Sequence, residues 1–165
     1  GSISASTTAT STSYSVGGIA GRQYGGGTID GCVNNGTVTA VSAVPVGGIT
    51  GQIYNASSMI TNCYNMGELV NTVSAGTLYM GGITGHMYAG GATVKNCYST
   101  GAITSGSTTT TYVKGLIGYI RITSLISPTE VDNIYYLNTI ASSGSNISGK
   151  GTAVTAEELQ ALAPK

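Results

Sequence analysis

The sequence predicts an all-β protein, a parallel β-helix (β-solenoid) of about four coils with a short C-terminal helix. Three observations lead to this fold class. The chain repeats itself four times, no repeat contains an amphipathic helical segment, and 26 of its 165 residues are glycine. A unit of roughly 30 residues cannot bury its own apolar positions, whereas successive units stacked in register bury them as continuous ladders.

A glycine-rich block opens each copy. The four blocks read "VGGIAG", "VGGITG", "MGGITG" and "VKGLIG", and each is followed by a second block, "TIDGCVNNGTV", "MITNCYNMGEL", "TVKNCYSTGAI" or "EVDNIYYLNTI". These blocks divide the chain into an N-terminal edge or partial preceding coil, four solenoid repeats, and a C-terminal loop with a capping helix. The boundaries are 1–15, then 16–45, 46–79, 80–112 and 113–140, and finally 141–165.

Columns of equivalent residues identify the expected core. Four apolar columns are predicted: Ile29, Ile60, Val94 and Val131; Val38, Leu69, Ile103 and Ile140; Val16, Val46, Met80 and Val113; and Ile19, Ile49, Ile83 and either Leu116 or Ile117. The shared glycines Gly36, Gly67 and Gly101 indicate a tight corner or a positive φ. A β-propeller has a similar period, but a blade needs four strands, for which these short glycine-rich copies leave little room.

The C-terminal segment "TAEELQALA" predicts a short helix over residues 155–163. Thr155 and Glu158 have the spacing of a capping box, and Leu159 and Leu162 follow at helical spacing. We expect this helix to cover the last coil, because an open solenoid end exposes strand edges.

The "GGIxG" blocks, "NCYNxG" in the second copy and "NCYSTG" in the third resemble the GLUG-type repeat of bacterial surface and secreted proteins. IgA-protease-like proteins carry such repeats in their non-catalytic part. The resemblance implies a β-helical fold, an extracellular or cell-surface bacterial location, and no catalytic residues. The fourth copy departs most from the pattern, with Lys114, Ile134 and Asn138 at positions of Gly, Cys and Gly.

Composition narrows the possible partners. Charged residues make up 7% of the chain and the net charge is zero, so no electrostatic field favours nucleic acid. No apolar run reaches the length of a membrane span, and we expect no membrane insertion. The opening "GS" is typical of a cloning remnant, and we expect the segment to continue into a larger multidomain chain.

The cysteines Cys32, Cys63 and Cys97 occupy one column, which Ile134 continues. Their spacing differs from that of zinc sites, and stacked strands about 4.8 Å apart would strain a disulfide. We therefore predict a reduced, buried cysteine ladder with no metal and no cofactor. Asparagines beside it are expected to brace the solenoid corner through a ladder of hydrogen bonds.

No catalytic constellation is evident, and we expect no enzymatic activity. His86 shares a column with Arg22, Gln52 and Tyr119, which predicts a solvated, outward position. Glu130 and Asp132 form at most a weak carboxylate pair for glycoside chemistry.

Tyrosines are the candidate ligand-binding residues. Tyr24, Tyr54 and Tyr88 form one column, and Tyr64, Tyr98 and Tyr135 form another directly after the cysteines. Exposed rows of tyrosine suit contacts with proteins or glycans, although the rings could instead pack between coils.

These features predict a non-catalytic structural or adhesive module that presents a polar Tyr/Asn/Thr-rich face to a host or cell-surface protein or glycan. The alternative is a carbohydrate-binding module that uses the stacked tyrosines. A β-helical polysaccharide lyase or glycosidase is supported by fold analogy alone.

Overall fold

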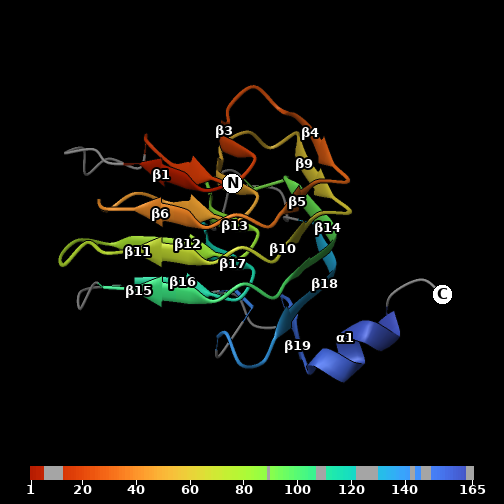
Figure 1. Ribbon diagram of the computed structural model, residues 1–165. Coiled ribbons are helices and arrows are strands. Elements are labelled where there is room, and N and C mark those ends of the chain that lie inside the picture. Colours follow the sequence, from red (N-terminus) through yellow and green to blue (C-terminus); the bar gives the residue numbers. More distant parts are fainter. Residues whose placement is uncertain are drawn as a thin grey trace.

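The computed structural model describes residues 1–5, 13–88, 90–106, 111–121, 130–141, 144–145 and 150–162. These residues form a parallel β-solenoid with one short helix at its C-terminal end (Figure 1). Every strand pairing in the described part of the chain is parallel. The predicted fold class is therefore confirmed.

Four sheets, which we call A to D, run along the solenoid axis. Sheet A contains β1 (Ile3–Ala5), β6 (Val38–Ala40), β11 (Leu69–Asn71) and β15 (Ile103–Ser105). Sheet B contains β2 (Val16–Gly17), β7 (Val46–Gly47), β12 (Leu78–Gly81) and β16 (Thr111–Lys114). Sheet C contains β3 (Ala20–Gln23), β8 (Thr50–Ile53), β13 (Thr84–Met87) and β17 (Ile117–Ile120).

Sheet D is the largest of the four. It contains β4 (Gly27–Asp30), β5 (Val33–Asn34), β9 (Ser58–Thr61), β10 (Tyr64–Asn65), β14 (Thr93–Ser99), β18 (Glu130–Leu137) and β19 (Thr152–Val154). The first two coils use two short strands in this sheet, whereas β14 and β18 are continuous.

Most residues of the apolar columns form two core clusters inside the solenoid, whereas Ile19, predicted to be in the core, is exposed at the N-terminal end of its column. The larger cluster lies between sheets C and D and includes Ile53, Ile60 and Met87, and the smaller one lies between sheets A and B and includes Leu69 and Met80. The predicted columns headed by Val16 and by Ile29 pair in register through all four copies. Register therefore follows the sequence repeat, because a slip of one residue would turn each apolar side chain outward.

Two columns differ in detail from the prediction. Leu116, and not Ile117, continues the column of Ile83, since the Ile83 amide donates to the Leu116 carbonyl while Ile117 lies opposite Thr84. Ile140 does not continue the column of Leu69. It follows β18 in a turn and packs against the larger cluster, and the column instead begins at Ile3, opposite Val38.

Glycines allow the sheets to approach one another closely. A Cβ atom on Gly48 would lie 2.2 Å from Cγ of Asn65, and one on Gly67 would lie 2.1 Å from the Gly36 carbonyl oxygen. The shared Gly67 column is thus a tight corner and not a site of positive φ. Only a residue without a side chain fits such a position.

Strand β19 closes the C-terminal edge of sheet D by pairing with β18. Helix α1 (Ala156–Leu162) follows it with the predicted capping box, in which the Thr155 amide donates to Glu158 and the Glu158 amide donates to Thr155 Oγ1. The helix buries none of its residues, and Leu162 is exposed. The helix contacts β18 of the last coil, and β19 pairs with the same strand. No helix in the described residues is long and apolar enough to cross a bilayer.

Candidate interaction surface

Tyr24, Tyr54 and Tyr88 follow the strands of sheet C and stack face to face. Their ring centroids are 5.0 and 4.7 Å apart, with interplanar angles of 14° and 9°. Tyr24, at the end of the stack, is 65% exposed, and the other two rings are half-buried. The sequence left open whether this column is exposed or packed between coils. In the structure the ring faces pack on one another and the stack remains at the surface.

Two arginines lie against this stack. The guanidinium carbon of Arg22 lies 4.1 Å from the Tyr54 ring centroid and 5.0 Å from that of Tyr24. Arg121 takes the tyrosine position in the fourth copy, and its guanidinium carbon lies 4.4 Å from the Tyr88 centroid. Cation–π contacts of this kind hold the guanidinium group against the ring.

The second tyrosine column lies on sheet D. Tyr64 and Tyr98 stack with centroids 4.8 Å apart and an interplanar angle of 3°, and both rings are half-buried. Burial and the neighbouring Tyr64 raise the pKa of Tyr98. Tyr135 continues the column in register and donates a hydrogen bond to Asn133 at 2.7 Å.

His86 is buried, which contradicts the predicted solvated position. Only 4% of it is exposed, since its ring stacks on Tyr79 at 4.8 Å and contacts Tyr88 and Tyr119. Burial, and secondarily the charge of Arg121, lower the pKa of His86 to about 4. Its Nδ1 lies 3.2 Å from Nε2 of Gln52, which is also buried.

Part of the cover over His86 comes from a tyrosine column on sheet B that the sequence analysis did not identify. Tyr79 and Tyr112 on sheet B stack at 5.3 Å, and Tyr112 contacts Tyr119 of sheet C at 4.6 Å. A signal was present, because an aromatic residue precedes "MGG" in the third copy and "VKG" in the fourth. Aromatic side chains of two sheets thus form one continuous surface with the Tyr24 stack.

The cysteines form the predicted ladder in register with Ile134, and all three are free. Cys63 and Cys97 are buried, whereas Cys32 is half-buried at the end of the ladder. The contact with Cys97 lowers the pKa of Cys63 to about 7, and the contact with Cys63 together with burial raises the pKa of Cys97. Burial raises the pKa of Cys32. The thiols act as small core side chains that contact backbone carbonyls.

Two polar ladders flank the cysteines. On the outer side, Asn62, Asn96 and Asn133 have φ of 54°, 52° and 51°, and Gly31 takes the same position with φ of 62°. The left-handed conformation explains why only Asn and Gly occur in this column. On the inner side, Asn34 donates to Asn65 at 2.8 Å.

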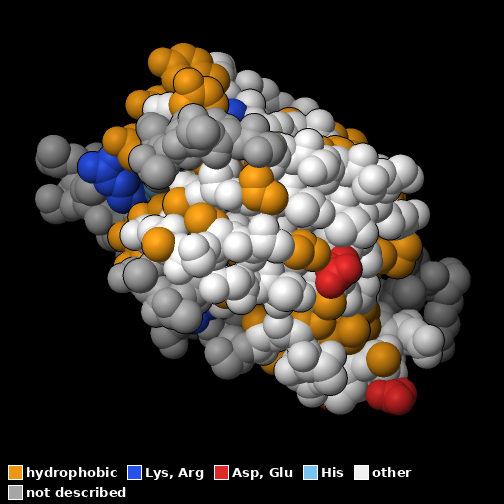
Figure 2. Space-filling model, turned by 60° about the vertical axis from the view of Figure 1, so that its left-hand side comes forward, with side chains coloured by type: hydrophobic (Ala, Val, Ile, Leu, Met, Phe, Trp, Pro, Cys, Tyr) orange, Lys and Arg blue, Asp and Glu red, His pale blue; other side chains and the backbone are white. Residues whose placement is uncertain are grey.

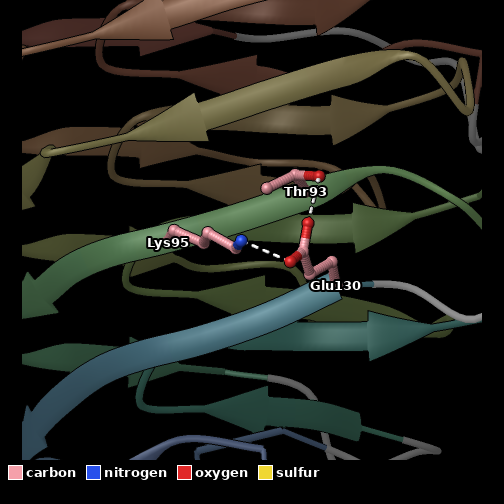
Figure 3. A network of polar contacts seen from close by, with 3 residues as sticks. All are labelled: Thr93, Lys95 and Glu130. Carbon is pink, nitrogen blue, oxygen red and sulfur yellow. Dashed lines mark hydrogen bonds and ion pairs between the residues drawn. The ribbon is translucent and has the colours of Figure 1, made fainter.

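One ion pair lies on sheet D, away from the tyrosine stack. Lys95 of β14 pairs with Glu130 of β18, and Thr93 donates to the same carboxylate at 3.4 Å (Figure 3). The Lys95 contact lowers the pKa of Glu130. This cluster joins two coils and pairs Glu130, one member of the weak carboxylate pair named above, with a cation.

Charge is sparse on the surface. The face in Figure 2 shows a few separate charged side chains among uncharged polar and apolar ones. Among the described residues, no group of three or more His, Cys, Asp or Glu side chains is placed to hold a metal ion.

Comparison with known families identifies the repeat. The family model of the GLUG motif matches residues 12–39. The chain carries a GLUG motif. No curated protein and no solved structure gave a significant match.

The matched GLUG motif spans β2 to β5 and the start of β6, which is most of the first solenoid coil. The later copies pair with this coil in register, which is consistent with a GLUG-type repeat region. The structure gives the motif positions a physical role. The glycines permit close contact between sheets, and the Asn and Cys positions stack into ladders.

Proposed function

We propose that this chain is a non-catalytic structural or adhesive module of a bacterial cell-surface or secreted protein. The observation that carries the proposal is that polar side chains of successive coils form hydrogen bonds with one another. Asn, Cys and Ser residues that could serve a reaction are instead joined from coil to coil in ladders. A stack built this way is a rigid spacer with a regular side surface.

The contact surface in this proposal is the polar, tyrosine-rich side of the solenoid, which would meet a host or cell-surface protein or glycan. A carbohydrate-binding module is the second candidate, favoured by the half-exposed stack of Tyr24, Tyr54 and Tyr88. Both faces of the Tyr54 ring are covered by neighbouring rings. Sugars would therefore meet ring edges and hydroxyl groups more than ring faces.

Location and activity can be tested separately. Antibodies raised against the 165-residue chain should label intact cells that produce the native protein as strongly as permeabilised cells. Labelling only after permeabilisation would contradict a surface role. Incubation of the chain with a panel of polysaccharides should release no new reducing ends or unsaturated products, and sustained turnover would show that the module is catalytic.

A further inference from the structure

Two neighbouring columns of sheet C form a strip along the solenoid axis, which we call the Tyr–Arg strip. One column consists of Arg22, Gln52, His86 and Tyr119, and the other of Tyr24, Tyr54, Tyr88 and Arg121. The strip therefore has an arginine near each end and aromatic or amide side chains between them.

Charges are segregated around the solenoid. The described acidic side chains all lie elsewhere: Asp30, Glu130 and Asp132 on sheet D, Glu68 before β11, and Glu157 and Glu158 on α1. The ion pair of Lys95 and Glu130 is the one salt bridge within the described residues. Arg22 and Arg121 consequently have no carboxylate partner there, and the strip is locally positive on a chain of zero net charge.

The spacing of the two arginines restricts the ligand. They lie three strands apart, which is roughly 14 Å at about 4.8 Å for each step between strands. A nucleic-acid duplex carries one charge about every 1.7 Å, far denser than this strip could match. Isolated negative charges separated by neutral, hydroxyl-bearing units fit the spacing better, and that is the chemistry of a carboxylate-bearing polysaccharide.

Three polar side-chain atoms beneath the same strip have no hydrogen-bond partner. Arg22 Nε, Gln52 Oε1 and His86 Nε2 are buried and have no hydrogen-bond partner, and they occupy three consecutive positions of one column. Leaving such an atom unpaired costs about 1–3 kcal/mol. With Gln52 Nε2 donating to His86 Nδ1, the neutral imidazole carries its proton on Nε2. Gln52 and His86 are 1% and 4% exposed, so their unpaired atoms lie beneath the tyrosines, and the groups of the strip that a ligand can reach are the arginines and the tyrosine edges.

We infer that the Tyr–Arg strip binds a carboxylate-bearing polysaccharide that runs along the solenoid axis, with Arg22 and Arg121 each pairing with a carboxylate. The tyrosine edges and hydroxyl groups between them contact the intervening sugar units. This inference rests on the proposed contact function and names its ligand class. The orientation of Arg22 is fixed by its Nη1, which donates to the Ser13 carbonyl at 3.2 Å.

The test uses the complete 165-residue chain and a hyaluronan oligosaccharide, in which each uronate is followed by a neutral N-acetylglucosamine, as the acidic probe, with a chitooligosaccharide of equal length as the neutral control. Calorimetry should detect binding of the hyaluronan oligosaccharide alone, and this binding should weaken as salt screens the charges. Arg22→Gln and Arg121→Gln should each weaken binding about tenfold, because a charge-assisted hydrogen bond is lost. Lys95→Gln, which removes a cation from sheet D, should leave the affinity unchanged.

Arg22→Lys distinguishes a lost ligand contact from a folding defect, because it keeps the positive charge but lacks the planar guanidinium group. We expect this variant to bind with intermediate affinity. Equal binding of acidic and neutral sugars, no binding of either, or an unchanged affinity in both Gln variants would overturn the inference. Binding of an oligonucleotide as tightly as the acidic sugar would also overturn it. None of these results would affect the surface labelling or the absence of turnover, which test the proposed function itself.

Discussion

Asn62 donates a hydrogen bond from Nδ2 to Oδ1 of Asp30 at 2.8 Å, and this contact ends the outer asparagine ladder. Asn133 donates to Asn96 at 2.7 Å, and Asn96 donates to Asn62 at 3.0 Å. The next residue in the column is Gly31, which has no side-chain acceptor. Asp30 supplies the acceptor from the adjacent position, and a carboxylate accepts more strongly than an amide.

Replacing Asp30 tests this end of the ladder. Hydrogen bonds from Thr61 and Asn62 lower the pKa of Asp30. A carboxyl pKa lowered by folding adds stability above its unfolded value, and this stability is lost as the pH falls through the folded value. We expect Asp30→Asn to lower the melting temperature at pH 7 and to reduce its decline below about pH 4. Asp132→Asn, at the other end of the same column, is the control, and identical pH profiles for the wild type and Asp30→Asn would contradict the assignment.

His86 should make stability depend on pH in a different range. Its folded pKa of about 4 lies below the ordinary value of 6.5, so the unfolded chain binds more protons between these values. The free energy of unfolding should therefore fall by about 3 kcal/mol as the pH decreases from 6.5 to 4. Urea denaturation of wild type and His86→Gln at several pH values measures this difference. A variant that keeps the wild-type slope would show that His86 is not the titrating group.

Gly48 should tolerate no side chain. Its added Cβ would meet Asn65 Cγ and the Gly82 carbonyl oxygen, each at 2.2 Å, and a backbone oxygen shifts less easily than the end of a flexible side chain. We expect Gly48→Ala to reduce the free energy of unfolding by about 3 kcal/mol. Gly25→Ala is the matched control, since nothing lies within 4 Å of its Cβ, and it should be nearly neutral. Similar losses in the two variants would show that generic glycine effects, and not close packing, limit this chain.

Two substitutions of Asn96 separate the effect of backbone conformation on stability from the effect of hydrogen bonding. Asn96→Gly removes the amide contacts but accepts the positive φ, as Gly31 does in the first copy. Asn96→Ala loses the same contacts and must also adopt a left-handed conformation, which costs about 1–2 kcal/mol. Chemical denaturation should rank the wild type above Asn96→Gly and Asn96→Ala last. If alanine were as stable as glycine, the left-handed geometry would not be what selects Asn in this column.

The cysteine ladder should react with thiol reagents in order of exposure. Cys32 is half-buried at the end of the ladder, whereas Cys63 and Cys97 are buried. We expect one thiol of the folded chain to be alkylated rapidly and the other two only after unfolding, because access limits reactivity even where the pKa is low. Mass spectrometry of peptides after a timed iodoacetamide pulse identifies the residue. Rapid labelling of Cys63 in the folded state would contradict its burial.

Most of the fold could be predicted from the repeat alone. The columns headed by Val16 and Ile29, the cysteine ladder and the capping box of Thr155 all depend on local spacing, which the sequence displays directly. Ile140 was misplaced because the fourth copy ends in a turn at this point, and a turn breaks the register that the earlier copies define.

The contact surface was only partly predictable. The sequence placed Tyr24, Tyr54 and Tyr88 in one column, and their stacking follows from that. It could not show that Tyr79, which belongs to another sheet, stacks on His86, or that Tyr112 stacks on Tyr79. Contact between two sheets depends on the angle of the corner between them, and no spacing within one copy encodes that angle.

The sequence by itself determined the architecture and the register, because each copy repeats the same apolar, glycine and asparagine positions and identical units stack best in phase. Only the tertiary structure decided where His86 lies, which ring faces are covered and which cations are left unpaired. Those properties arise where side chains of different sheets and different coils meet. They follow from the path of the whole coil and not from any one repeat.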